Sequence, residues 1–362
     1  MDARIIEDEA EFSALAAPWQ ALALDCGARP FQDFGWASAW LRTIGAAGGY
    51  RPRVVTLWDG SRLRGVLPLA CRQYRGVRLL EWMGTRVTDY CDALIDPGIE
   101  RRAALHTLWD ALNKRGGFDV IRLGQVPAGA AANELCHGVE PWIETTENSL
   151  AIPLRWRSGV DWLRQQSSKA CHRVRYGLRR LARMGFEFEV WQAPDSTAPL
   201  LDALIEQKRA WLAARHLDGH LQRPEGRAFV HACAEAMAAG GTLHLSALRS
   251  RDHIAACHLG FFRDGTFYYY MPTYDAAWSK YSAGTLLLDS LIMWACDHGA
   301  RRFDMLLGAH GYKLHYGAVA ETVRTLVVGR GLLGKAAVRF YRASTTRTRR
   351  AAEVVATPLP LY

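Results

Sequence analysis

The sequence has no apolar leader, no long apolar run and no paired-cysteine motif. Its first residues, MDARIIEDEAEF, are acidic and lack the apolar core of a signal peptide. No apolar run reaches the roughly 18–20 residues of a membrane span, and Asp289 interrupts the apolar stretch TLLLDSLIMWAC. These absences predict a cytoplasmic protein without a membrane-spanning helix.

Metal-binding cysteine patterns are also missing. None of the eight cysteines is spaced as CxxC, and no tight Cys/His cluster indicates zinc. Most of the cysteines lie among apolar neighbours, as buried reduced thiols do in cytoplasmic proteins. We therefore expect no metal cofactor.

Acidic residues are absent from two segments, and this concentrates the positive charge. Residues 164–186 contain seven lysines and arginines, residues 322–352 contain eight, and neither segment contains an acid. These fifteen charges exceed the net charge of +9, so the rest of the chain is net acidic. Each basic segment should therefore face an anionic partner or water.

The remaining composition is that of a folded protein, and its pattern predicts one order of elements twice. With 362 residues, 49% of them hydrophobic, the chain can bury a full core and is long enough for two domains. In the first half we expect a helix at about 8–25, strands at 53–58, 62–71 and 77–84, a helix at 100–115 and a strand at 118–123. In the second half we expect helices at about 196–215 and 225–239, strands at 242–248, 253–262 and 266–272, a helix at 283–298 and a strand at 302–306.

The two halves also match in sequence. GGFDVIRLGQ at 116–125 parallels ARRFDMLLGA at 300–309, which sets Asp119 against Asp304. An internal duplication is the simplest explanation, and chance similarity of two α/β units is the alternative. Strands joined by hairpins and then by a crossover helix predict an α/β fold with a mixed sheet, antiparallel first and parallel at its end.

A basic helix is predicted between the halves, at 167–185. Its apolar residues follow steps of three and four and form one stripe, whereas Lys169, Arg173, Arg180 and Arg183 fall on another face. That face could be a solvated linker surface, a site for an anionic substrate or a cofactor phosphate, or a nucleic-acid contact. The residues alone do not choose among these.

Small residues open the helix predicted at 283–298. The stretch YSAGTLLLD places Ser282, Ala283, Gly284 and Thr285 where a strand and a short loop lead into the helix, with Lys280 just before. The first N–H groups of a helix have no partner inside it, and small side chains let a phosphate approach them. An ordinary serine N-cap on a core helix is the alternative interpretation.

Three segments in this order resemble the GNAT acyltransferases, and among them the FemAB-like double-GNAT type. They are PFQDFGWASAWLRTIG (30–45), SSKACHRVRYGLRRLARMG (167–185) and YDAAWSKYSAGTLLLDSLIMWACDHGARRFDMLLGAHGYKLHYG (274–317). The resemblance is to the branch of cellulose and exopolysaccharide acetyltransferases, and it extends to about residue 330. It implies two tandem GNAT-like domains: a degenerate domain at 1–150 and a donor-binding domain at 151–330, followed by a basic helix and tail at 331–362.

The resemblance also implies acyl-CoA, and first acetyl-CoA, as the donor. Its pyrophosphate would bind at Lys280, Ser282, Ala283, Gly284 and Thr285. The family pattern is Gln/Arg-x-x-Gly-x-Gly/Ala, and this segment has one glycine. The first half has DPGIERR at the matching place, without a glycine loop, so one donor site is expected. Aminoacyl-tRNA, which FemAB-like relatives use, remains open as the donor.

Candidate catalytic residues follow the donor helix. Asp304 lies in a short apolar strand, where a carboxylate must be paired or functional, and Lys313 could be its ion-pair partner. In the functional interpretation Asp304 orients or deprotonates the acceptor, and Lys313, Tyr312 or both bind the donor phosphate or stabilise the oxyanion. Tyr312 could also protonate the leaving thiolate. His258, in a predicted strand, is a base candidate or a core histidine.

The acceptor would be an amine or hydroxyl on a sugar, polysaccharide or peptide precursor, a class that the resemblance alone supplies. Candidate substrate residues are Lys169, Arg173, Tyr270, Tyr274 and His315. The basic segment 331–350 could contact anionic membrane or be a solvated tail. The other hypotheses are tRNA-dependent aminoacyl transfer, and a non-catalytic binding protein on the same fold.

Overall fold

The computed structural model describes residues 1–136, 140–308 and 311–355. The chain forms two compact units built from non-contiguous segments. The first unit contains Met1–Cys26, Gly48–Thr146 and Val323–Tyr362, and the second contains Gly27–Ala47 and Glu147–Thr322. The domain limits 1–150, 151–330 and 331–362 stay a prediction.

The second unit is built on one mixed sheet. Its strands lie in the order β10-β11-β12-β13-β14-β9; among these described strands the β13–β14 pair is parallel and the other neighbouring pairs are antiparallel. The strands are β10 (Glu187–Val190), β11 (Leu243–Arg249), β12 (Ile254–Arg263), β13 (Thr266–Tyr274), β14 (Arg302–Leu307) and β9 (Trp142–Pro153). Helix α9 (Ala283–Asp297) crosses between the two parallel strands, so the predicted α/β mixed sheet is confirmed.

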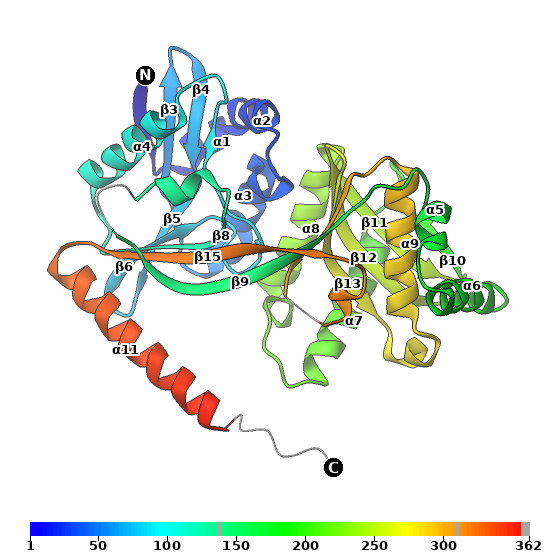
Figure 1. Ribbon diagram of the computed structural model, residues 1–362. Helices are drawn as coiled ribbons and strands as arrows, with labels where there is room; N and C mark the ends of the chain where they lie inside the picture. The colour runs from blue at the N-terminus through cyan, green and yellow to red at the C-terminus, as the bar shows by residue number, and fades with distance from the viewer. Residues whose placement is uncertain (137–139, 309–310, 356–362) are drawn as a thin grey trace. The chain divides into compact units, whose positions relative to one another are not determined.

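Helices cover both faces of this sheet. Figure 1 shows α5 (Gly159–Arg164) and α6 (Ser168–Ala182) beside α9 on one face. The other face carries α7 (Ala198–Ala213) and α8 (Pro224–Ala239), and α3 (Phe34–Trp40) packs on α8. Arg263 of β12 donates to Asp33 at 2.7 Å, which ties the early segment to this unit. Short helix α10 (Gly311–Leu314) follows β14.

The first unit has the same parallel step but a divided sheet. In one sheet β1, β3, β4 and β7 are neighbours; the other sheet contains β15, β8, β6, β5 and β2. The strands are β1 (Asp2–Ile6), β2 (Arg51–Pro52), β3 (Val54–Asp59), β4 (Arg62–Leu67), β5 (Leu69–Tyr74), β6 (Val77–Trp82), β7 (Leu94–Ile95), β8 (Val120–Pro127) and β15 (Val319–Gly329). Helix α4 (Arg101–Arg115) joins parallel β6 and β8. The other helices of this unit are α1 (Glu9–Ala14), α2 (Ala16–Asp25) and α11 (Gly331–Val355).

The single strand predicted at 62–71 is wrong, because Pro68 splits it into β4 and β5 in different sheets. Proline has no N–H to donate to a strand ladder. The second half keeps one strand, β12, at the matching place, with a register shift between Leu259 and Phe261. In each unit, a strand from the other half of the sequence lies beside the parallel pair. Strand β9 pairs with β14, and β15 pairs with β8.

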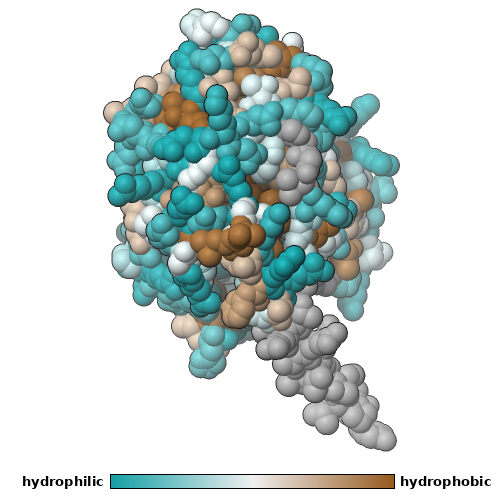
Figure 2. Space-filling view, turned by 90° about the vertical axis from the view of Figure 1, so that its left-hand side faces the viewer, coloured by the Kyte–Doolittle hydropathy of each residue, from teal (hydrophilic) through white to brown (hydrophobic). Residues whose placement is uncertain are grey.

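Hydrophilic side chains predominate on the face shown in Figure 2, and hydrophobic ones are scattered over it. Within the residues that the structure describes, no helix is long and apolar enough to cross a bilayer. One core cluster of the second unit lies between the sheet and α9, where Phe267, Phe303, Leu287 and Leu291 are buried.

Candidate functional site

The N-terminus of α9 lacks a side-chain cap. Ser282 adopts the left-handed conformation (φ 58°, ψ 34°), and its side chain forms no cap hydrogen bond. Its carbonyl accepts the N–H of Leu286 at 3.0 Å, so the helix begins here, but the N–H groups of the first turn are left to other partners. Ser282 and Thr285 are exposed. This does not match the ordinary serine N-cap considered for the sequence.

Helix α6 approaches this end of α9 closely. A Cβ on Gly177 would lie 2.7 Å from Leu286, so only glycine fits without displacing that side chain. The contact brings the Arg180 guanidinium 4.4 Å from the ring of Tyr281, and Lys280 lies 5.2 Å from the same ring. Two cations therefore flank the residue that precedes Ser282, where the helix dipole also favours an anion.

A buried carboxylate fixes α6 further along the same helix. Asp289, in the second turn of α9, is fully buried and pairs with Arg173 of α6 at 3.0 Å. It also accepts the hydroxyl of Tyr316 at 3.0 Å. Burial raises the pKa of Asp289, and Arg173 and Tyr316 oppose that rise. Arg173 thus joins α6 to α9 instead of projecting freely from the basic face.

Asp289 is a residue of this region that the sequence pattern did not predict. The available signal was a carboxylate inside an otherwise apolar helix, because such a group must find a partner when it is buried.

Tyrosines gather next to Asp289. Burial raises the pKa of Tyr269 well above its usual value, and the neighbouring Tyr312, Tyr316 and Asp289 add to the rise. Asp289 lies five residues after Gly284 on α9, about 7.5 Å along the helix axis at 1.5 Å per residue. Tyr312 keeps 44% of its surface exposed. The first turns of α9 and the residues around α10 therefore belong to one region.

The two parallel strands separate beside this region. Their ladder pairs Thr266 with Arg302, and it ends where Tyr268 faces Asp304. Beyond that pair β13 continues to Tyr274, whereas β14 ends at Leu307.

Asp304 is buried and held by several groups. Its Oδ1 accepts the N–H of Leu306 at 2.9 Å, and its Oδ2 accepts Arg302 at 3.2 Å. Arg302 also binds Glu321 at 2.8 Å. Lys313 is buried too, and its Nζ donates to the carbonyls of Met305 (2.7 Å) and Leu307 (2.9 Å). It thereby ties α10 to the end of β14.

His258 lies in the core under α9. Its ring stacks between Tyr269 (4.9 Å) and Phe267 (5.5 Å), and a Cβ on Gly260 would meet it at 2.3 Å. Neither ring nitrogen has a hydrogen-bond partner among the residues that the structure describes. Burial first, and then the nearby His244, lower its pKa well below the usual value. The environment favours the neutral ring.

The other predicted residues are dispersed. Tyr274 packs under α9, with its ring 3.1 Å from where a Cβ on Gly284 would be. Tyr270 packs on the opposite face, against Trp36 and Phe261. Lys169, in the first turn of α6, and His315, just after α10, are exposed. Among the described residues, no group of three or more His, Cys, Asp or Glu side chains could hold a metal ion.

Residues 168–314 match the family described as "Acetyltransferase (GNAT) domain". The match covers α6, the whole strand series β10–β14 and the start of α9 described above. The chain carries a GNAT acyltransferase domain. This GNAT domain lies within the second unit.

Solved structures share the GNAT-containing fold at low identity. FemX is 11% identical with a TM-score of 0.61, and the alignment covers 90% of this chain and 97% of that one. The C-terminal domain of a putative lysylphosphatidylglycerol synthetase from Agrobacterium fabrum is 13% identical, with a TM-score of 0.55 and coverage of 92% and 96%. L-PGS from Bacillus licheniformis is 13% identical, with a TM-score of 0.54 and coverage of 87% and 91%. A search among curated proteins found no match.

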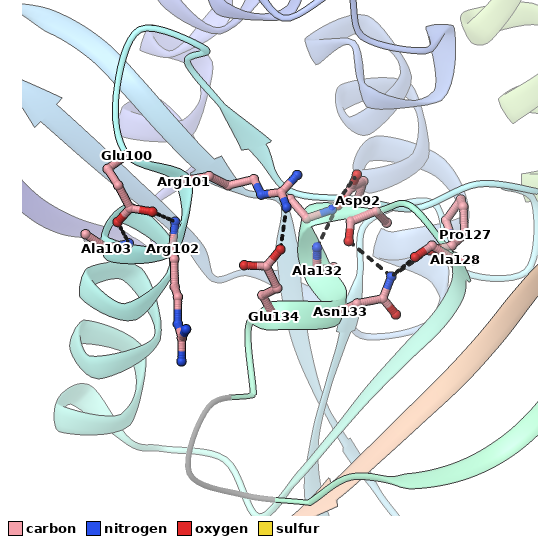
Figure 3. A network of polar contacts seen from close by, with 12 residues as sticks. Asp92, Glu100, Arg101, Arg102, Ala103, Pro127, Ala128, Ala132, Asn133 and Glu134 are labelled. Carbon is pink, nitrogen blue, oxygen red and sulfur yellow. Dashed lines mark hydrogen bonds and ion pairs between the residues drawn. The ribbon is translucent and has the colours of Figure 1, made fainter.

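The helix of the first half that corresponds to the GNAT helix α9 begins differently. At the start of α4, Glu100 accepts the N–H groups of Arg102 (2.9 Å) and Ala103 (2.5 Å), as Figure 3 shows. These two bonds lower the pKa of Glu100, so the cap is an anion. Nearby polar groups also have partners within the protein: Arg101 pairs with Glu134, and Asp92 accepts the N–H of Ala132 (Figure 3).

Proposed function

We propose that this protein transfers an acyl group, and first an acetyl group, from acyl-CoA to an amine or hydroxyl of a sugar, polysaccharide or envelope precursor. The observation that carries the donor assignment is the uncapped N-terminus of α9, with Lys280 and Arg180 beside it. The acceptor class rests on the resemblance to exopolysaccharide acetyltransferases.

The donor pyrophosphate would bind the N–H groups of Ala283, Gly284 and Thr285. Ser282, exposed at the N-cap, adds a hydroxyl, and Lys280 adds a charge. Gly284 leaves the backbone open, because a side chain there would crowd Tyr274. Such a site combines orphan N–H donors with the helix dipole, which is how phosphates bind at helix N-termini.

The acyl-bearing arm would lie where β13 and β14 separate. The edge of β13 beyond Tyr268 presents strand N–H and C=O groups, and an extended amide chain can pair with such groups. This path leads from the start of α9 towards Tyr269 and Tyr312.

The chemistry requires three groups. A base takes the proton of the acceptor nitrogen or oxygen as that atom attacks the thioester carbonyl, and a hydrogen-bond donor stabilises the negative carbonyl oxygen. An acid protonates the thiolate that is released when the C–S bond breaks. Tyr312 is exposed enough to reach a substrate and is our candidate to protonate that thiolate. Asp304, Lys313 and His258 are buried, so we propose that they position the end of β14, α10 and β13 around the acceptor.

Substrate contacts would come from exposed and from half-buried residues. Lys169 on α6 and His315 after α10 are exposed, and Tyr270 and Tyr274 are half-buried on the two faces of β13. Arg173 contributes through its pairing with Asp289, which orients α6. No direct contact of Arg173 with substrate is needed for this role.

The second candidate function is aminoacyl transfer from charged tRNA to a peptide or envelope precursor. Two observations favour it: the fold shared with FemX and with a putative lysylphosphatidylglycerol synthetase, and the exposed basic residues of α6. In that case tRNA would bind the α6 face with an affinity that falls steeply with salt.

We place the reaction in the cytoplasm, at the membrane periphery. All eight cysteines are free thiols, as expected in a reducing compartment. Contact of the segment 331–350 with anionic membrane belongs to this proposal and would bring the enzyme to an envelope precursor.

Calorimetry with acetyl-CoA, and with longer acyl-CoAs, tests the donor assignment. Thr285→Trp should abolish binding, because the indole would cover the first turn of α9. Ala103→Trp is the matched control, since Ala103 is exposed at the same helical position of α4. Failure of every acyl-CoA to bind the wild-type chain would exclude the first proposal. Salt-sensitive binding of charged tRNA in its place would support the second.

A further inference from the structure

The C-terminal helix α11 has a buried face and an exposed apolar face. Its buried face packs on the first unit: Ala337 and Val338 contact the cluster of Leu79, Val120 and Val327. Gly334 permits this approach, because a Cβ there would lie within van der Waals overlap of the Asp119 carbonyl. Figure 1 shows the helix running on from β15 past β6.

A tyrosine fixes the rotation of the helix about its own axis. The Tyr341 hydroxyl donates to Oε1 of Glu144 at 2.5 Å, and its ring meets Trp142 edge-on at 5.8 Å. Arg122 binds the other oxygen of Glu144 at 2.6 Å. The opposite side of the helix therefore has a defined orientation.

That opposite side exposes large apolar residues. Leu332 is 91% exposed, Phe340 78% and Leu333 56%. At about 100° per residue these three side chains and Ala336 fall within one arc of about 100°. Three large exposed hydrophobic residues in one arc mark an interaction surface better than scattered ones do.

The charge beside this arc is positive. Lys335 and Arg339 are exposed and lie on its flank, and no acidic residue occurs between 322 and 352. Apolar side chains that enter a bilayer boundary, flanked by cations that meet lipid phosphates, are the pattern of helices that lie on anionic membranes. A nucleic-acid contact would account for the cations but not for the exposed leucines and phenylalanine.

We infer that the face formed by Leu332, Leu333, Ala336 and Phe340, with Lys335 and Arg339 beside it, docks on an anionic lipid surface. The inference rests on the membrane contact within the proposed function and specifies its residues and its lipid chemistry. It needs no acyl transfer, so its test and the acyl-CoA test fail independently.

Vesicle co-sedimentation of the full chain tests the inference. Binding to phosphatidylcholine vesicles containing phosphatidylglycerol should exceed binding to pure phosphatidylcholine and should fall with salt. The triple variant Leu332→Ser/Leu333→Ser/Phe340→Ser should lose about tenfold or more in partitioning, because it removes the buried apolar area. The control Leu24→Ser/Val160→Ser/Leu217→Ser removes three exposed apolar side chains elsewhere and should bind as the wild type does.

A charge variant gives a second arm. Lys335→Gln/Arg339→Gln should weaken binding to anionic vesicles by about tenfold and flatten its salt dependence. Lys114→Gln/Arg102→Gln removes the same two residue types from exposed positions on α4 and should change neither. Unchanged melting temperatures would show that the variants fold.

Three outcomes would overturn the inference. The wild-type chain could fail to sediment with anionic vesicles, or the triple variant could bind them as well as the wild type. Light scattering could also show a dimer that the triple variant abolishes, which would mean that a second copy covers this face.

Discussion

The crossover helix of each half begins in a different state. At α4 the Glu100 carboxylate occupies the first N–H groups, whereas at α9 Ser282 leaves them without a side-chain cap. Both helices have 15 residues and both join parallel strands, so the dipole at their starts is the same. What differs is whether the protein supplies its own anion. An internal carboxylate competes with a ligand phosphate, so the proposed donor site is confined to the second half.

The strands around these helices differ in the same sense. Pro68 breaks the first half into two sheets, while β12 runs on through Gly260, whose missing side chain leaves room for the His258 ring. The second half thus keeps a continuous sheet beneath its helix. The first half has the same crossover between parallel strands, but Glu100 caps the start of its helix.

Converting the start of α9 into that of α4 should have the largest effect. Ser282→Asp places a carboxylate at the N-cap, and aspartate tolerates the left-handed backbone at this position. Its charge should compete with the donor phosphates and lower acetyl-CoA affinity by about 100-fold in calorimetry, without loss of melting temperature. Ser282→Asn, which keeps the shape without the charge, should cost much less. Equal losses in the two variants would contradict the charge argument.

Acid should weaken the second unit through its buried histidines. Burial lowers the pKa of His244 to about 3 and that of His258 well below its usual value. Unfolded histidines protonate below about pH 6.5 and these two stay neutral when folded, so the stability that they contribute is lost as pH falls through that value. Each should cost about 2 kcal/mol in the free energy of unfolding at pH 5.

The variant His244→Phe should remove about half of this dependence in denaturant titrations between pH 7 and 5, because His258 remains. If His244→Phe retains the full acid dependence, the buried ring is not its source.

Removing the Tyr312 hydroxyl should have a smaller effect. The corresponding position in the first half is Pro127, whose side chain has no proton to donate. Tyr312→Phe should lower kcat by roughly tenfold through loss of the proton donor, with the KM for acyl-CoA unchanged. A rise in KM at constant kcat would assign Tyr312 to binding instead.

The smallest effect is expected for Glu100→Gln. The amide oxygen keeps the cap geometry but loses the charge, so acetyl-CoA affinity should not change and the melting temperature should fall slightly. Appearance of a second acyl-CoA site in calorimetry would show that Glu100 alone closes the first half, which would sharpen the comparison further.

Local signals predicted much of the fold. Alternating apolar residues located β11, β12 and β13, and the amphipathic stripe that ends at Gly185 located α6, where Gly185 has φ 81°. His258 and Gly260 share one face of β12, as strand alternation requires: a Cβ on Gly260 would meet the His258 ring at 2.3 Å. The run at 62–71 misled because its apolar pattern continues through Pro68, and the pattern does not record a missing N–H.

The roles of the candidate residues remain predictions, but their surroundings depend on distant segments. The sequence suggests Lys313 as an ion-pair partner of Asp304, yet its Nζ binds the carbonyls of Met305 and Leu307. Arg173 reads as part of a basic face, yet it pairs with Asp289. No spacing rule connects such residues, because their partners come from other elements.

The sequence by itself determined the order of strands and helices, the repeat of that order and the small residues that open α9, since these depend on neighbours along the chain. Only the tertiary structure decided which of the two helix starts stays open and what surrounds it. Glu100 caps α4 through its backbone geometry, and Gly177 brings Arg180 to α9 from a distant helix. The Glu100 cap is a local contact within the first turn of α4. The surroundings of α9 depend on packing between remote segments, because only packing places Arg180 within contact distance of Tyr281.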